Sequence, residues 1–341
     1  MLSRVADCLY WMSRYIERAE NTARLLDVNL QLMLDFEGMD DAALTTHWQP
    51  IIACSGQLEL FKSLYSSSDS HSVQEFMTFN RENPNSILSC INTARENARM
   101  VRDQISGEMW EVINGTYHRL RNWDTQSVLD SGAYEFYEDL KNDALLFQGL
   151  TDSTFTHDQG YKFIQIGKYL ERADQTSRII DIKYHMLLPD PDDVGGAVDL
   201  AQWMAVLRSC SAFEAYHHRY VDEVQPWYVA EFLTLSPTFP RSIRFCVSTL
   251  DYHLRSISST AGGQFTNSAE QQSGRMRSEL IYTTIDEIFT EGLHEYLDRL
   301  QLRLIDLNSA IFETYVQQPE IDIGREIEQQ HQQQQLILAG G

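Results

Sequence analysis

The chain lacks the sequence features that define several large protein classes. No apolar run in its 341 residues approaches the ~18 residues that a membrane-spanning helix needs. Its five cysteines are widely spaced and form no C-x-x-C pair, which indicates reduced thiols rather than a disulfide framework or a zinc site. There is no Walker loop, no G-x-G-x-x-G and no G-x-S-x-G. We therefore expect a cytoplasmic protein without a recognisable catalytic or nucleotide-binding motif.

Positive charge is also scarce. Lysine and arginine number 27 against 49 aspartates and glutamates, for a formal net charge of −22. This sign repels phosphate backbones and anionic lipid, so neither nucleic acid nor a membrane is an expected partner. A basic partner or a cationic substrate would complement the charge, although acidity that serves only solubility is more common.

Strand patterns are missing, and helical patterns run through the chain. From Leu2 to Met33 the apolar residues are spaced alternately by three and four, which predicts a long helix with one narrow packing seam. A second seam of this kind runs from Phe163 to Leu187. The predicted fold class is all-α, built as a helical bundle.

One stretch of the first predicted helix occurs twice. Arg14–Val28 returns 154 positions later as Lys168–Ile182, with seven of fifteen residues identical. Ordinary residue usage would give roughly one chance match over this length. The identical residues include the adjacent Glu-Arg pair at the centre of each copy.

The repetition extends further along the chain. Glu75–Cys90 recurs as Glu231–Cys246 at a shift of 156, and Cys54 and Cys210 obey the same shift. We therefore predict an internally duplicated bundle with two pseudo-symmetric halves. The expected parts are a first helical repeat at 1–150, a second at 151–317, and a Gln-rich, disordered tail at 318–341.

Two features of the repeated segment carry local predictions. The paired cysteines lie among apolar neighbours, so they are expected to be core residues rather than nucleophiles. Pro84 and Pro240 are each followed by one residue and then by Ser-Ile. Because the first turn of a helix tolerates proline, we expect each proline to begin a helix.

The duplicated charged residues are the candidates for a functional motif. The pattern predicts pairs within each helix, from Glu20 to Arg24 and from Arg24 to Asp27, and the second copy repeats them. A solvated helix face laced with salt bridges is one interpretation. However, such a face does not need fixed identities, and the two copies kept these residues while their neighbours diverged. The candidates are Glu17, Arg18, Arg24, Asp27, Glu171, Arg172, Arg178 and Asp181.

Partial burial of this motif would require a partner for each charge. Glu17 and Arg18 diverge by about a right angle on a helix and cannot pair with each other. If the halves meet about a pseudo-dyad, Glu17 would pair with Arg172 and Glu171 with Arg18.

Metal and cofactor sites find little support in the sequence. Glu214 with His217 and His218 gives an E-x-x-H spacing like that of di-iron bundles, but the first half offers no counterpart. We expect no metal, no cofactor and no catalytic residue.

At the duplicated Tyr-Ile/Leu-Glu-Arg-Ala-Glu/Asp motif the chain resembles the bacterial alpha-E family, all-helical proteins named for their repeated Glu-Arg motif. The opening residues, Leu2–Asn21, are similar to that family's N-terminal signature, and the resemblance covers roughly residues 1 to 317. Members are typically encoded beside an ATP-grasp protein and a transglutaminase-like cysteine protease. The resemblance thus implies a non-catalytic helical partner or scaffold subunit of an ATP-grasp-type peptide or amide ligase.

Two other functions stay open. The Glu-Arg stripes can line a pocket for amino acids or peptides, with arginines clamping carboxylates and Glu17 or Glu171 acting as a base. Alternatively, the chain is itself a ligase substrate through its terminal Gly340-Gly341.

Overall fold

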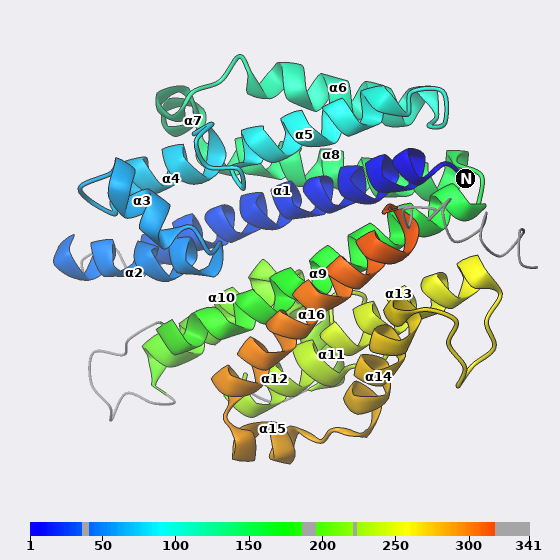
Figure 1. Ribbon diagram of the computed structural model, residues 1–341. Coiled ribbons are helices and arrows are strands. Elements are labelled where there is room, and N and C mark those ends of the chain that lie inside the picture. Colours follow the sequence, from blue (N-terminus) through cyan, green and yellow to red (C-terminus); the bar gives the residue numbers. More distant parts are fainter. Residues whose placement is uncertain (36–40, 186–195, 221–223, 318–341) are drawn as a thin grey trace, which may run out of the picture.

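The structure is a computed structural model in which all secondary structure is helical across the described residues, as the sequence predicts (Figure 1). The described residues are 1–35, 41–185, 196–220 and 224–317. The first eight helices are α1 (Ser3–Asp35), α2 (Asp41–Cys54), α3 (Leu58–Leu64), α4 (Ser70–Thr78), α5 (Ile87–Met100), α6 (Gly107–Leu120), α7 (Thr125–Ser131) and α8 (Ala133–Thr154). The next eight are α9 (Gln159–His185), α10 (Ala197–Ser209), α11 (Phe213–Arg219), α12 (Pro226–Leu235), α13 (Ile243–Ser258), α14 (Ser268–Tyr282), α15 (Ile285–Glu291) and α16 (Leu293–Tyr315).

The long helices α1 and α9 pack against each other at the centre of the molecule. Their predicted seams are buried, with Met12 and Ala23 of α1 and Ile166 of α9 fully excluded from solvent. The two backbones lie very close together at Gly167, where an added Cβ would lie 2.4 Å from the Tyr10 carbonyl oxygen. A glycine is therefore required for the two helices to meet at this distance.

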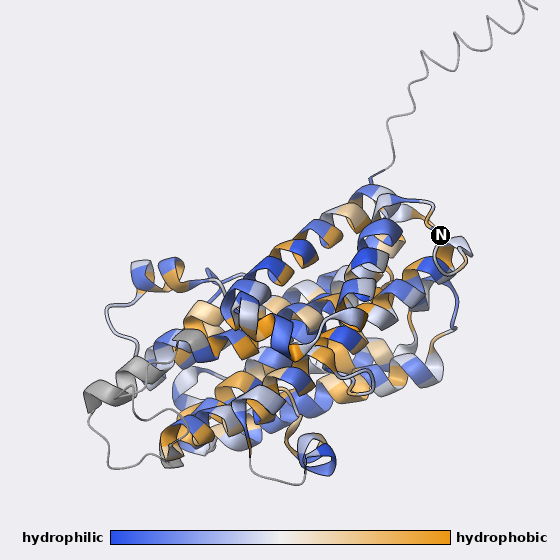
Figure 2. Cartoon of the chain, turned by 90° about the horizontal axis from the view of Figure 1, so that it is seen from below, coloured by the Kyte–Doolittle hydropathy of each residue, from blue (hydrophilic) through white to orange (hydrophobic). Residues whose placement is uncertain are grey.

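Each long helix packs on its outer side against two helices, and a third helix packs on those two. α5, α6 and α8 lie on one side of the central pair, and α13, α14 and α16 lie on the other (Figure 1). Figure 2 shows hydrophobic and hydrophilic residues on nearly every helix, as expected for helices that bury only one face. One continuous hydrophobic core joins both halves.

The order of helices agrees with the predicted duplication, which itself remains a prediction. In the first half the long helix α1 is followed by the shorter helices α2–α4, then by α5, and then by α6–α8, of which α8 is long. The second half has the same order, with α9, α10–α12, α13 and α14–α16. The predicted boundary at 150/151 falls inside α8, and the chain passes from one half to the other at 155–158. The predicted tail, 318–341, with Gly340-Gly341, lies outside the described residues.

The two repeated prolines do not begin helices, contrary to the sequence prediction. Each lies in the turn before the helix, and a serine caps the helix instead. The Ser86 hydroxyl accepts a hydrogen bond from the Ser89 backbone N–H at 3.2 Å, and Ser242 caps α13 in the same way. A serine at this position satisfies a backbone donor that proline could not, because proline has no acceptor side chain. The five cysteines are all buried and unpaired, which confirms their place in the core.

Candidate functional site

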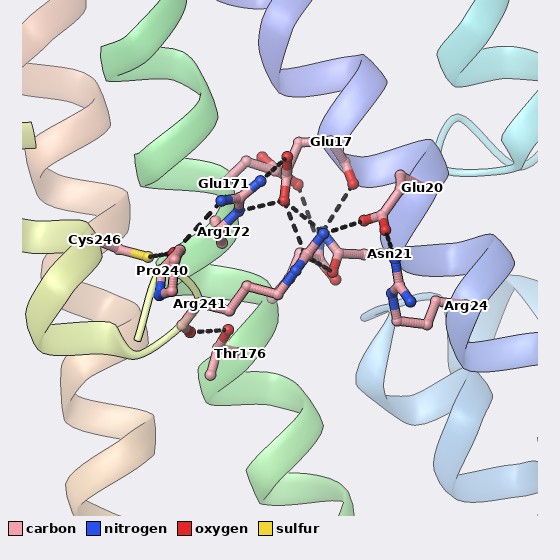
Figure 3. A network of polar contacts seen from close by, with 11 residues as sticks. Glu17, Glu20, Asn21, Arg24, Glu171, Arg172, Thr176, Pro240, Arg241 and Cys246 are labelled. Atoms are coloured by element: carbon pink, nitrogen blue, oxygen red, sulfur yellow. Dashed lines mark hydrogen bonds and ion pairs between the residues drawn. The ribbon is translucent and has the colours of Figure 1, made fainter. Parts of the chain in front are cut away.

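The two copies of the Glu-Arg motif meet where α1 crosses α9. Arg172 Nε and Nη2 donate to the two carboxylate oxygens of Glu17 at 2.7 and 2.9 Å (Figure 3). Arg18 Nε and Nη2 donate to the two oxygens of Glu171 at 2.6 and 3.0 Å. Both reciprocal pairs predicted from the sequence are therefore confirmed, and both are bidentate, the strongest geometry for an arginine and a carboxylate.

A third guanidinium completes the group around Glu17. Arg241 comes from the turn before α13, and its Nη1 lies 3.1 Å from both Glu17 Oε1 and Asn21 Oδ1. Its Nη2 donates to Glu20 Oε2 at 2.9 Å (Figure 3). The sequence analysis did not identify Arg241. The only signal for it was the Pro-Asn-Ser-Ile of the first copy becoming Pro-Arg-Ser-Ile in the second.

The group around Glu171 also has a second guanidinium. Arg14 lies one turn before Arg18 on α1, and its Nε donates to Glu171 Oε2 at 2.8 Å. The Arg14 Nη1 donates to Asn308 on α16 at 2.6 Å, which ties the motif to the last helix. Each central glutamate thus accepts hydrogen bonds from two arginines.

Burial and charge together fix the protonation of these glutamates. Glu17 is 2% exposed and Glu171 is fully buried. Burial by itself would raise the pKa of Glu17, but the charges of Arg172 and Arg241 outweigh burial and hold that pKa below its ordinary value. Arg18 and Arg14 act in the same way on the pKa of Glu171. Near neutral pH both carboxylates are ionised with their oxygens occupied, which makes them poor general bases.

The outer candidates also form pairs, although not all as predicted. Arg24 pairs with Glu20, and Arg178 Nε donates to Asp174 at 2.9 Å, as the helical spacing indicated. The expected pair of Arg24 with Asp27 does not form, because Asp27 contacts another helix.

Asp27 instead binds Lys141 Nζ of α8 at 2.7 Å. In the second half, Asp181 lies 2.7 Å from His294 Nδ1 of α16. Both aspartates thus fasten a central helix to the last long helix of the same half. The i,i+3 spacing alone did not reveal these partners, because α8 and α16 lie far away in the sequence.

A polar cavity lies beside the ion pairs. Its volume is about 270 Å³, and side chains from both motif copies line it. Arg18 and Asn21 contribute from α1, and Asp174 and Arg178 from α9. Neither Glu17 nor Glu171 reaches this cavity.

Two further features concern metals and membranes. Within the described residues, no three or more histidine, cysteine, aspartate or glutamate side chains gather closely enough to hold a metal ion. His217 of the E-x-x-H spacing packs its ring against Phe213 and Tyr216. Of the helices in the described ranges, none has the length and apolar character needed to cross a membrane.

Similar sequences occur in mycobacteria. The chain is 24% identical over 318 residues to an uncharacterized protein of Mycobacterium bovis and to uncharacterized proteins from two strains of Mycobacterium tuberculosis. Each match covers 87% of this chain but 34% of the relative, so the chain spans about a third of the length of these proteins. No solved structure matches the chain significantly. A family model described as a predicted alpha-helical domain with a conserved ER motif matches residues 1–316, and the chain therefore belongs to this family, Alpha-E.

Proposed function

We propose that the chain is a non-catalytic helical partner or scaffold subunit of an ATP-grasp-type peptide or amide ligase system in the cytoplasm. The observation that carries the non-catalytic part is the enclosure of the Glu-Arg motif. Glu17 and Glu171 are buried, each is held by two arginines, and the pKa of each is lowered. The carboxylates of the motif are therefore committed to contacts within the fold and have no free oxygen to offer a substrate.

Two observations support a role beside another protein. In the mycobacterial relatives the matched region is joined to about twice its own length of further sequence, so the helical body works there as one part of a larger chain. The net charge of −22 suits a partner with a basic surface. The choice of an ATP-grasp ligase, with a transglutaminase-like protease as a second partner, rests on the family resemblance of the duplicated motif.

Co-expression with an ATP-grasp ligase from the same organism tests the proposal. We expect the two proteins to co-purify as a defined complex that weakens as salt rises, because the attraction is electrostatic. The chain alone should form no amide from ATP, an amino acid and a peptide, whereas the ligase rate should change when the chain is added. The absence of any complex with folded protein, with and without nucleotide and substrate, would contradict the proposal.

A second candidate function is the binding of amino acids or peptides, and the polar cavity between the two motif copies favours it. Arg18 and Arg178 both line this cavity. Catalysis by Glu17 or Glu171 is disfavoured, because both are enclosed away from the cavity. Calorimetric titration with amino acids and short peptides tests this candidate separately from partner binding.

A further inference from the structure

Residues that line the polar cavity have counterparts in the second half, at positions shifted by 154 or 156. The correspondence follows from the repeated sequence: Arg18 corresponds to Arg172, and Cys54 to Cys210. Across the central helix pair, Asp174 corresponds to Glu20 and Arg178 to Arg24. The two sites therefore share an arginine on each helix and an acidic residue in an i,i+4 pair with one of them. The residue that differs most is Asn85 in the first half, which corresponds to Arg241 in the second.

In the second half the guanidinium of Arg241 occupies this place. It donates to three acceptors, which are Glu17 Oε1, Glu20 Oε2 and Asn21 Oδ1, at distances of 2.9 to 3.1 Å (Figure 3). The backbone of Arg241 is held as well, because the Thr176 hydroxyl donates to its carbonyl oxygen at 2.8 Å.

In the first half the shorter Asn85 side chain leaves Asp174 and Gln175, the counterparts of Glu20 and Asn21, without this guanidinium. Glu171 takes its second arginine from Arg14 instead. Asn85 Oδ1 accepts a hydrogen bond from Arg18 Nη1 at 2.7 Å. Asp174 Oδ2 accepts from Arg178, but Asp174 Oδ1 is buried and accepts no hydrogen bond within the described part of the chain. A buried carboxylate oxygen without a donor is costly, so a turn of the Asp174 carboxylate toward a donor in the cavity would remove this cost.

We propose that this cavity binds the guanidinium group of a ligand, in the place that the second half gives to its own Arg241. The Asp174 carboxylate corresponds to that of Glu20 as the anionic acceptor, and the side-chain amide of Gln175 corresponds to that of Asn21. The inference does not depend on the proposed partnership with a ligase.

The arginines around the cavity do not oppose a cationic ligand. Glu171 is shared by Arg14 and Arg18, and Asp174 pairs with Arg178. The second half holds the same set of cations, because the buried Lys168 corresponds to Arg14. In the second half Arg172 and Arg24 are paired in the same manner, and the Arg241 guanidinium lies between them. A volume of about 270 Å³ is sufficient for a guanidinium with a short alkyl chain.

Calorimetric titration with ethylguanidine tests the proposal, with butylamine and acetate as probes of other charge and shape. We expect one ethylguanidine per chain and weaker binding of both other probes. Asp174→Asn should weaken binding by about tenfold or more, because it removes a charged acceptor. Asn85→Arg should abolish binding, since it supplies an internal guanidinium as Arg241 does, and it should raise the melting temperature.

Glu96→Gln is the matched control. Glu96 pairs with Arg99 three residues along α5 on an exposed surface, away from the cavity lining, so this variant should bind as the wild type does. Circular dichroism confirms that every variant is folded before titration. No binding by the folded wild type, binding unchanged in both Asp174→Asn and Asn85→Arg, or tighter binding of acetate would each overturn the proposal.

Two further probes distinguish the sources of the guanidinium. N-acetyl-arginine amide represents an arginine side chain within a peptide or protein, and agmatine represents a small molecule. Tighter binding of the first assigns a peptide or protein ligand, and tighter binding of the second assigns a small metabolite. Either result supports recognition of the guanidinium, whereas binding of neither would overturn it.

Discussion

Glu17 on α1 and Arg172 on α9 form a buried bidentate ion pair, although 155 positions separate them in the chain. Glu171 and Arg18, their sequence neighbours, form the reciprocal pair. Adjacent helical residues point about a right angle apart, so a Glu-Arg step cannot pair within itself and needs a second copy across the interface. The buried charges of each copy of the motif therefore find their partners in the other copy.

The first prediction concerns the close contact of the two central helices at Gly167. Gly167→Ala should lower the free energy of unfolding by about 1–3 kcal/mol, because the new methyl group overlaps the Tyr10 carbonyl. Gly149→Ala is the matched control. Gly149 lies in α8 with no atom within 4 Å of an added Cβ, so alanine there should stabilise by about 0.5–1 kcal/mol. Urea unfolding measures both, and equal effects of the two variants would contradict the packing described.

The second prediction concerns Arg241. Arg241→Asn should lower the free energy of unfolding by about 1.5–3 kcal/mol, because Glu17 and Glu20 each lose a charged donor while remaining buried. In the control, Arg99→Asn, the lost pair lies at the surface and the change should be under about 1 kcal/mol. If Arg241→Asn lowered the free energy of unfolding no more than the control does, the Arg241 guanidinium would not stabilise the fold, which would contradict the prediction.

Acid should unfold the protein through the buried glutamates. Burial raises the pKa of Glu20, but the charges of Arg241 and Arg24 overcome this and lower the pKa from 4.5 to about 2. Because the folded pKa is the lower one, the stabilisation is complete above pH 4.5 and is lost as the pH falls toward 2. In Glu20→Gln the slope of stability against pH over this window should be reduced. An unchanged slope, measured by urea unfolding at several pH values, would contradict this.

The stability that comes from the pair of His294 with Asp181 should depend on pH in the opposite direction. The hydrogen bond that His294 Nδ1 donates to the Asp181 carboxylate raises the pKa of His294 above its ordinary 6.5. Its stabilisation is therefore full below pH 6.5 and is lost as the pH rises through the higher folded value. His294→Lys should retain the pair at higher pH, as Lys141 does with Asp27 in the first half. The melting temperature of the wild type should thus fall more than that of the variant between pH 6 and pH 9, and identical falls would count against the pair.

Much of the central helix pair was predictable from the sequence. The spacing of apolar residues from Leu2 to Met33 predicted α1, and the repeat at Lys168–Ile182 predicted that α9 would resemble it. The pairing of each central glutamate with the arginine of the other copy followed from the need of buried charges for partners.

The partners that come from elsewhere in the fold were not predictable. Arg241 and Lys141 reach the motif from other helices or turns, and their contacts depend on how those elements pack. The turn at Pro84 was misjudged, because both proline and serine favour the start of a helix and the serine hydroxyl prevailed as the cap. The cavity could not be foreseen, since its lining comes from segments far apart in the sequence, including α1, Asn85 and α9.

The central claim is that the Glu-Arg motif holds α1 to α9, and a double-mutant cycle tests it most directly. Glu17→Gln and Arg172→Gln should each lower the free energy of unfolding by about 3–5 kcal/mol, because each leaves a buried charge without its partner. The double variant should lose less than the sum of the two by roughly 2 kcal/mol or more, because neither residue is then charged. Additive losses, or single variants as stable as the wild type, would contradict the claim.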